Sequence, residues 1–192
     1  MPSLSETERC ALLELARKAI VAAVSLQKLA GDISQGETFA GKRGLFVTLR
    51  IRGRLRGCIG VIEPFEPLGE SVARCAASAA LNDVRFSPLR SEELPEVQIE
   101  ISVLSALEPI RPENIEIGRH GLLISQGAKR GILLPQVAVE HKLGRERFLE
   151  ETCRKAGLNI DAWQEPETQI LGFTCDVFSE QEESREPSPT SV

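Results

Sequence analysis

The sequence predicts an α+β fold with mixed, mainly antiparallel sheets, and three observations lead to this class. Several stretches alternate apolar and polar residues, which is typical of strands with one face in a core. Other stretches have the spacing of amphipathic helices. The order of hairpin, helix and strand occurs twice along the chain, which indicates an internal duplication. Because strands joined by short turns pair antiparallel and each helix can cover one sheet face, an α+β arrangement follows.

The first predicted element is a helix at the N-terminus. Ser5 and Glu8 have the spacing of a capping box, in which each side chain bonds the backbone N–H of the other residue. Apolar residues then recur along one helical face: Leu12, Ala16, Ile20, Ala23 and Val24. We expect this helix to end near Gly31, and we expect a loop over residues 31–44, which are rich in glycine and polar side chains.

The two repeats share one order of elements. The first has strands from Gly44, a helix from Pro67 to Asn82 and a strand from Val97 to Ser105. The second has strands from Gly121, a helix from Arg145 to Ala156 and a strand from Ile170 to Ser179. We therefore divide the chain into an N-terminal helix (1–30), a first repeat (31–110), a second repeat (111–180) and a polar tail (181–192) expected to be disordered.

The segment RIRGRLRGCIG, residues 50–60, reads as a hairpin with arginines on the face away from the core. The even-numbered residues of the two strands are mostly polar: Thr48, Arg50, Arg52, Arg54, Arg56 and Cys58. A three-residue turn at 52–54 keeps the two strands in phase and puts Arg50 opposite Arg56. Thr48 then lies opposite Cys58, and Ile51 opposite Leu55. A two-residue turn would mix the two faces, so we expect the three-residue turn.

Cys58 falls on this arginine face and has two interpretations. Nearby guanidinium groups stabilise a thiolate, and Gly57 and Gly60 leave room for a ligand or another backbone, which favours a reactive thiol. Cysteine is also among the most often buried residue types, which favours an inert, packed thiol. The arginines likewise form either an anion-binding surface, with Arg50 and Arg56 as candidate ligands, or an ordinary solvated strand face.

Other candidate site residues lie outside the hairpin. Asp83 follows the helix of the first repeat and could pair with Arg85, itself a candidate anion ligand. His141 could act as a general base, because histidine titrates near neutral pH. The histidines and cysteines have neither H-x-x-x-H nor C-x-x-C spacing, so no metal site is predicted. The glycines match neither G-x-G-x-x-G nor a P-loop, which leaves the cofactor unknown.

Composition narrows the classes of partner and compartment. The 192 residues have a formal net charge of -5, which argues against a general nucleic-acid binder. The five cysteines lack a C-x-x-C pair and read as reduced thiols, which predicts a cytoplasmic location. No apolar run approaches the roughly 20 residues that span a bilayer, so membrane insertion is not expected.

Several of these segments closely resemble the AMMECR domain family, whose members include protein A of the AmmeMemoRadiSam system. They are LRGCIG at 55–60, DVRF at 83–86, ISVL at 101–104, GILLPQVA at 131–138, FL at 148–149 and KAGL at 155–158. The resemblance runs from about residue 8 to residue 178, and LRGCIG is highly specific to the family. It implies one AMMECR-like domain over 1–180, with two unequal α/β subdomains built from a duplicated strand-helix-strand motif. The matching signature positions are Arg56, Gly57, Cys58, Gly60, Asp83, Arg85, Pro135 and Gln136.

The resemblance carries over no established reaction, but it implies partners. Bacterial relatives look like partners of a Memo-type protein with a dioxygenase-like fold and of a radical S-adenosylmethionine enzyme. Two positions depart from the family pattern. Val84 stands where relatives often have proline, and Leu143-Gly144 stands where many have Trp-Asp. These departures weaken a role for the region around His141 and leave the LRGCIG segment unaffected.

Two functional hypotheses follow. In the first, the protein is a binding or accessory component, and its arginine-rich hairpin face docks a partner protein or a small anionic ligand. In the alternative, the protein is an enzyme with Cys58 as thiolate nucleophile or redox group. Arg50 and Arg56 would then hold an anionic substrate, and His141 or Asp83 would move a proton. The sequence shows no catalytic triad, metal set or cofactor loop, which favours the first hypothesis.

Overall fold

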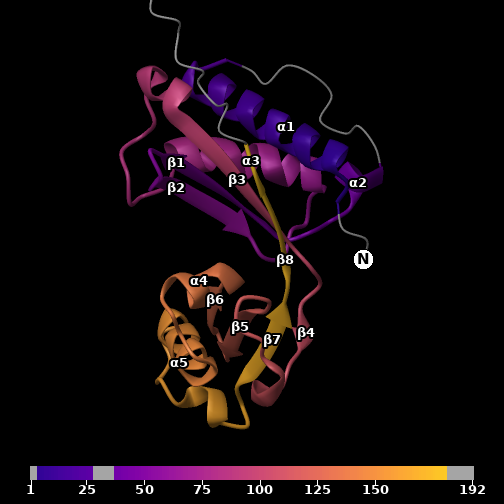
Figure 1. Ribbon diagram of the computed structural model, residues 1–192, viewed down its shortest axis with the longest axis vertical. Helices are drawn as coiled ribbons and strands as arrows, with labels where there is room; N and C mark the ends of the chain where they lie inside the picture. Colours follow the sequence, from indigo (N-terminus) through magenta and orange to yellow (C-terminus); the bar gives the residue numbers. More distant parts are fainter. Residues whose placement is uncertain (1–3, 28–36, 181–192) are drawn as a thin grey trace, which may run out of the picture.

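Two lobes stacked along the long axis make up the protein (Figure 1). The structure is a computed structural model, and it describes residues 4–27 and 37–180. The expected tail at 181–192 and the start of the expected loop, residues 31–36, lie outside the described residues.

Sheet A forms the upper lobe with three helices. Its strand order is β2-β1-β3-β8, and all neighbours are antiparallel. The strands are β1 (Leu45–Ile51), β2 (Arg54–Val61), β3 (Val97–Leu104) and β8 (Cys175–Ser179). The helices are α1 (Glu6–Val24), α2 (Glu37–Ala40) and α3 (Leu68–Leu81), and a short 3-10 helix, η1 (Ser91–Glu96), precedes β3. The apolar odd-numbered residues of β1 and β3 form one core with α1 and α3.

Sheet B forms the lower lobe, with the order β4-β7-β5-β6 and antiparallel neighbours. Its strands are β4 (Glu108–Pro109), β5 (Gly121–Gln126), β6 (Lys129–Leu133) and β7 (Gln169–Phe173). The helices are α4 (Pro135–Glu140) and α5 (Arg145–Lys155), with 3-10 helices η2 (Pro112–Asn114) and η3 (Ala162–Gln164). A second, smaller core lies between α5 and sheet B. The predicted α+β class with mainly antiparallel sheets is therefore confirmed.

The two lobes exchange strands. β4 follows β3 in the chain but pairs with β7 in sheet B, whereas β8 follows β7 but pairs with β3 in sheet A. The two connections meet where Ser105 N donates to Thr174 O at 2.9 Å and Thr174 N donates to Ser105 Oγ at 3.0 Å. In Figure 1, β8 extends from the lower lobe into the upper one. Each sheet is therefore completed by a strand from the other half of the chain, while the boundaries of the two repeats stay a prediction.

The N-terminal helix has the predicted start and an earlier end. Ser5 N donates to Glu8 Oε2 at 2.7 Å and Glu8 N donates to Ser5 Oγ at 3.4 Å, so the capping box is confirmed. The helix ends at Val24, not near Gly31, because Leu26 takes a left-handed φ of 55° that an α-helix cannot continue through. The expected loop also contains the short helix α2.

Two other elements differ from the prediction. The expected single strand from Ile170 to Ser179 is two strands, β7 and β8, since the chain passes from sheet B to sheet A at Thr174. Helix α4, which was not predicted, begins at Pro135, shortly after the end of β6. Proline suits that first turn because its missing N–H would have no partner there.

Corresponding glycines let a hairpin approach a helix in each lobe. A Cβ on Gly57 would lie 2.1 Å from the Ala79 carbonyl oxygen in α3. A Cβ on Gly131 would lie 2.3 Å from the Ala156 backbone nitrogen at the end of α5. Both glycines follow an arginine in the second strand of a hairpin. This correspondence supports the predicted duplication.

Candidate functional site

The β1–β2 hairpin has a two-residue turn, so the predicted three-residue turn is wrong. Ile51 pairs with Arg54, which leaves Arg52 and Gly53 as the turn, both with positive φ. Two consecutive residues with positive φ are typical of the turn whose twist matches the flanking strands. A two-residue turn alone would put the two strands out of phase, and an irregularity further along the hairpin corrects this.

A β-bulge brings the two strands back into phase. The register shifts between Leu49 and Arg50, so that Arg50 pairs with Leu55 and Leu49 pairs with Gly57. Arg56 is the extra residue, and beyond it the predicted pairing of Thr48 with Cys58 is confirmed. The predicted pairing of Arg50 with Arg56 is wrong.

The arginines of the hairpin consequently do not share one face. Arg54, opposite Ile51, has the parity of the core side, and Arg52 lies in the turn. Arg52 forms an ion pair with Glu96 at 2.8 Å. Of the predicted arginine row, Arg50 lies on the same side of β1 as Thr48, and its half-buried side chain has no hydrogen bond or ion pair among the described residues.

Arg56 serves the fold of the upper lobe. Its guanidinium donates to both carboxylate oxygens of Glu93, at 2.8 and 3.0 Å, and to the backbone oxygen of Ser87 at 2.9 Å. This ion pair, with a side-chain exposure of 14% for the arginine, also holds the pKa of Glu93 below its usual range. Arg56 thus fastens the segment before β3 to the hairpin, and its charge is already neutralised.

The backbone of Cys58 is closed off at the free edge of sheet A. β2 is an edge strand, so the outward N–H and C=O groups of its residues have no strand partner. Asp83 Oδ2 accepts from Cys58 N at 2.8 Å, and Arg85 Nη2 donates to Cys58 O at 3.2 Å. The two side chains therefore bind the edge of Cys58 as a neighbouring strand would.

The structure brings Asp83 and Arg85, two positions that match the family signature, together with Cys58. Arg85 Nε and Nη2 donate to the two carboxylate oxygens of Asp83 at 2.9 and 2.6 Å, which confirms the predicted pair. The hydrogen bonds from Arg85 and Cys58 hold the pKa of the buried Asp83 far below its usual range. A carboxylate in this environment is a poor proton acceptor, which argues against a role for Asp83 as general base.

The thiol of Cys58 lies on the face of sheet A that is opposite α1 and α3. It is half-buried, and Thr48 Oγ1 donates to its Sγ at 3.3 Å. Burial raises the pKa of the Cys75 thiol to about 11 and that of the Cys175 thiol to about 12. The Cys58 thiol thus combines partial exposure with a hydrogen bond from a hydroxyl group.

Gly57 and Gly60, on either side of Cys58, lack room for a side chain for different reasons. Gly57 admits the backbone of α3, as described above. A Cβ on Gly60 would lie 2.2 Å from a ring carbon of Phe46, its cross-strand partner. The expected room for another backbone is confirmed at Gly57, whereas the space at Gly60 is filled by the Phe46 ring.

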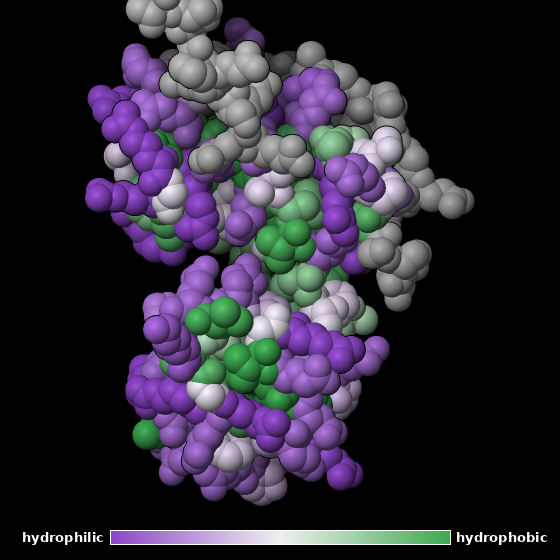
Figure 2. Space-filling view, in the orientation of Figure 1, coloured by the Kyte–Doolittle hydropathy of each residue, from purple (hydrophilic) through white to green (hydrophobic). Residues whose placement is uncertain are grey.

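Helix α4 of the lower lobe contacts the same face of sheet A. Gln136 Nε2 lies 3.5 Å from Ser102 Oγ, and Ser102 is a buried residue of β3. A second link between the lobes is the ion pair of Arg130 with Glu63 at 3.2 Å. Figure 2 shows the molecular outline indented between the lobes on the side of the hairpin. Gln136 therefore lies where the two lobes meet, and we call the side of sheet A that holds Thr48, Arg50, Cys58, Glu100 and Ser102 the polar face.

Both histidines lie in the lower lobe. His141 ends α4 and lines a cavity of about 510 Å³ together with Arg147 and Glu151 of α5. His120 lies before β5 and accepts a hydrogen bond on Nδ1 from Glu116 N at 3.0 Å. No hydrogen bond among residues 4–27 and 37–180 joins either ring to Cys58. Within the same residues, no cluster of His, Cys, Asp or Glu could hold a metal ion, and no helix could span a membrane.

Sequence reasoning did not find Glu93 and Gln136 as partners in this region. It placed Thr48 opposite Cys58, and the structure adds the hydrogen bond from the Thr48 hydroxyl to the Cys58 sulfur. Glu93 lies 37 residues from Arg56, and no local pattern links the two. For Gln136, the signal was Pro135, because a proline followed by helix-forming residues marks a first turn.

Comparisons with known proteins agree with this architecture. The model of the AMMECR1 family matches residues 13–178. A protein of Methanothermobacter thermautotrophicus is 41% identical over 187 residues, which cover 92% of this chain and 96% of that protein. A protein of Aquifex aeolicus is 39% identical over 179 residues, covering 89% and 92%. The crystal structure of an uncharacterized protein from Pyrococcus horikoshii matches with a TM-score of 0.83 and 37% identity, covering 89% of this chain and 90% of that one.

Proposed function

The chain belongs to the AMMECR1 family, and from this premise we propose that it is a binding or accessory component whose polar face docks a partner protein. The partners that the family resemblance implies are a Memo-like protein and a radical S-adenosylmethionine enzyme. If the polar face binds a small molecule instead of a protein, we propose that this molecule is anionic and is held by Arg50. The proposed setting is the cytoplasm.

The observation that carries the proposal is the fixed backbone of Cys58 on a face that also holds charged side chains without a partner among the described residues. Asp83 and Arg85 fix the backbone of Cys58, and Gly57 packs it against α3. On the same polar face, the side chains of Arg50 and Glu100 are half-buried, and neither side chain has a hydrogen bond or ion pair among the described residues. Half-buried charges on a rigid face are suited to pairing with charges of a second molecule, which gives specificity to an interface.

The surroundings of the Cys58 thiol favour a binding role over a catalytic role. A catalytic cysteine is commonly activated by a base within hydrogen-bond reach. Thr48 supplies a hydroxyl, the carboxylate of Asp83 is occupied by Arg85, and both histidines lie in the other lobe. The described residues near Cys58 therefore offer a fixed surface and no acid-base pair.

The test is the affinity for each purified partner from the same organism, measured by calorimetry. We expect Arg50→Ala to weaken binding by about tenfold, since a charge-assisted hydrogen bond contributes about 1.5–3 kcal/mol. Arg52→Ala is the matched control, because Arg52 lies in the same hairpin and is exposed. An equal loss in both variants, or binding unaffected by Arg50→Ala, would contradict docking through the polar face.

The alternative is an enzyme with Cys58 as nucleophile or redox group, and the Thr48 hydrogen bond to Sγ favours it. A hydroxyl donor stabilises a thiolate, as hydrogen bonding to a charged form does in general. The Cys58→Ser variant separates the two proposals. It would keep partner affinity if the protein only binds, and it would abolish turnover by the assembled complex if the thiol reacts.

A further inference from the structure

A cavity of about 730 Å³ lies where the two strand connections cross, and the polar face does not contribute to it. It is lined from both lobes, by Ser105 and Glu108 after β3 and by Thr174 after β7. Ligand pockets of proteins commonly measure about 300–1,000 Å³. The cavity therefore has the size of a small-molecule site.

Three basic side chains line this cavity. Arg43 stands before β1 and is half-buried, with no hydrogen bond or ion pair among the described residues. Arg119 pairs with Glu116 at 3.0 Å, but both side chains are more than half exposed, so this pair is weak. His120 accepts on Nδ1 from Glu116 N, so in its neutral form it carries its hydrogen on Nε2, which is free to donate.

Two carboxylates also line the cavity, and one is already neutralised. Asp176 forms an ion pair with Arg9 at 2.8 Å and accepts from Leu4 N at 3.2 Å. Glu108 is then the lining carboxylate that is not neutralised, whereas Arg43, Arg119 and the Nε2–H of His120 can each donate to an anion. The balance of unpaired groups favours an anionic ligand.

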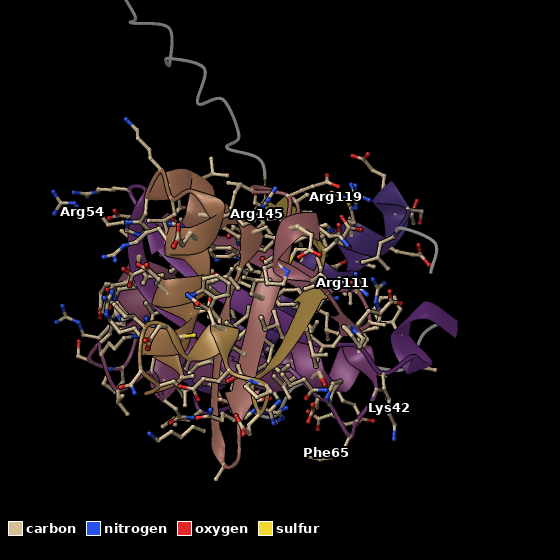
Figure 3. All side chains as sticks on the ribbon, turned by 90° about the horizontal axis from the view of Figure 1, so that it is seen from below. Lys42, Arg54, Phe65, Arg111, Arg119 and Arg145 are labelled. Atoms are coloured by element: carbon tan, nitrogen blue, oxygen red, sulfur yellow. The ribbon has the colours of Figure 1, made fainter. Side chains whose placement is uncertain are left out.

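The predicted duplication would account for the basic residues that converge here. Arg43 lies two residues before β1 and His120 directly precedes β5, so the two basic residues stand near the starts of the two hairpins. Ser105 and Thr174 correspond in the same way, one in each connection. Figure 3 shows that Arg119 and Lys42, which adjoins Arg43, lie on one side of the molecule, and that Arg54 of the hairpin lies on the other.

We propose that this cavity is a second binding site, for a small molecule with a phosphate or carboxylate group held by Arg43, Arg119 and His120. Arginine suits such a group because its planar guanidinium donates two parallel hydrogen bonds to it. The site is separate from the polar face. Its proposed role is either to regulate docking or to hold a substrate of the assembled complex.

The test is titration of the full chain with inorganic phosphate, followed by two-dimensional NMR of the backbone amides. We expect saturable shifts confined to the amides around Arg43, Ser105, His120 and Thr174. Arg43→Gln should weaken binding by about tenfold. Arg54→Gln is the control, because Arg54 is exposed and remote from the cavity.

Several outcomes would overturn the proposal. They are an absence of saturable shifts, shifts spread over the surface, and equal weakening by Arg43→Gln and Arg54→Gln, which would show non-specific attraction. If Arg43→Gln unfolds the chain, the same titration of Arg119→Gln decides in its place. Arg50→Ala, which tests the polar face, should leave phosphate binding unchanged, so failure of one proposal does not decide the other.

Discussion

Asp83 accepts the backbone N–H of Cys58 at 2.8 Å while its other oxygen accepts from Arg85, so one buried carboxylate closes the sheet edge beside the family signature. This relationship gives the acidic residue of the signature a structural reason. It also explains why Asp83 and Arg85 accompany LRGCIG, although 25 residues separate Asp83 from Cys58.

The first prediction concerns this edge. We expect Asp83→Ala to lower the free energy of unfolding by about 2 kcal/mol, because Cys58 N–H would lose its partner in a partly buried position. Urea unfolding measures the change. Asp161→Ala, at an exposed aspartate, is the control, and a similar small effect in both variants would show that the edge bonds contribute little.

The second prediction concerns acid stability. The pKa of Asp83 is lowered in the folded protein, so its contribution is fully present above the unfolded-state value of about 4 and is lost as pH falls toward the folded-state pKa. We expect Asp83→Asn to lose less stability than the wild type between neutral pH and pH about 3. Parallel declines of the urea midpoint in the two proteins would refute this account.

The third prediction concerns the close approach of hairpin and helix. Gly57→Ala and Gly131→Ala should each destabilise the protein by about 3 kcal/mol or more, since the new Cβ would overlap backbone atoms of Ala79 or Ala156. Gly144→Ala, where no atom lies within 4 Å, should cost about 1 kcal/mol or less, since Gly144 caps the start of α5 and alanine is a poorer cap. Thermal unfolding compares the three. A mild effect at Gly131 with a large one at Gly57 would argue against equivalent roles.

The fourth prediction concerns the exchanged strand β8. Glu180 at its end accepts from Ile99 N at 3.1 Å and from Arg17 Nε at 3.0 Å. We expect Glu180→Ala to speed amide hydrogen exchange in β8 by about tenfold, because the end of the strand loses its anchor to α1 and β3. Glu167→Ala, at an exposed glutamate outside the strands, serves as comparison. Unchanged exchange in β8 would mean that strand pairing alone holds it.

The sequence predicted the hairpin faces well because alternation is a local property. The parity of Leu45 to Leu49 and the pairing of Thr48 with Cys58 were correct. The turn was wrong because a bulge at Arg56 compensates a two-residue turn, and a bulge leaves no distinct trace in an alternating pattern. An alternating row of arginines therefore did not translate into one arginine face.

Longer-range relationships were beyond sequence patterns. The segment 170–179 alternates throughout, and nothing in it marks Thr174 as the crossing from one sheet to the other. The pairing of Arg56 with Glu93 depends on how η1 folds back, which spacing does not encode. The resemblance marked Asp83 and Arg85 as signature positions, and only the structure shows that both bind the backbone of Cys58.

The most direct test of the central claim is the alkylation rate of Cys58 in the free protein and in complex with each proposed partner, resolved by mass spectrometry. Cys10, which is exposed on α1, is the internal control. If a partner docks on the polar face, alkylation of Cys58 should slow in the complex while that of Cys10 stays the same. An unchanged rate at Cys58 in a complex shown to be formed would contradict docking there and would redirect attention to the thiol itself.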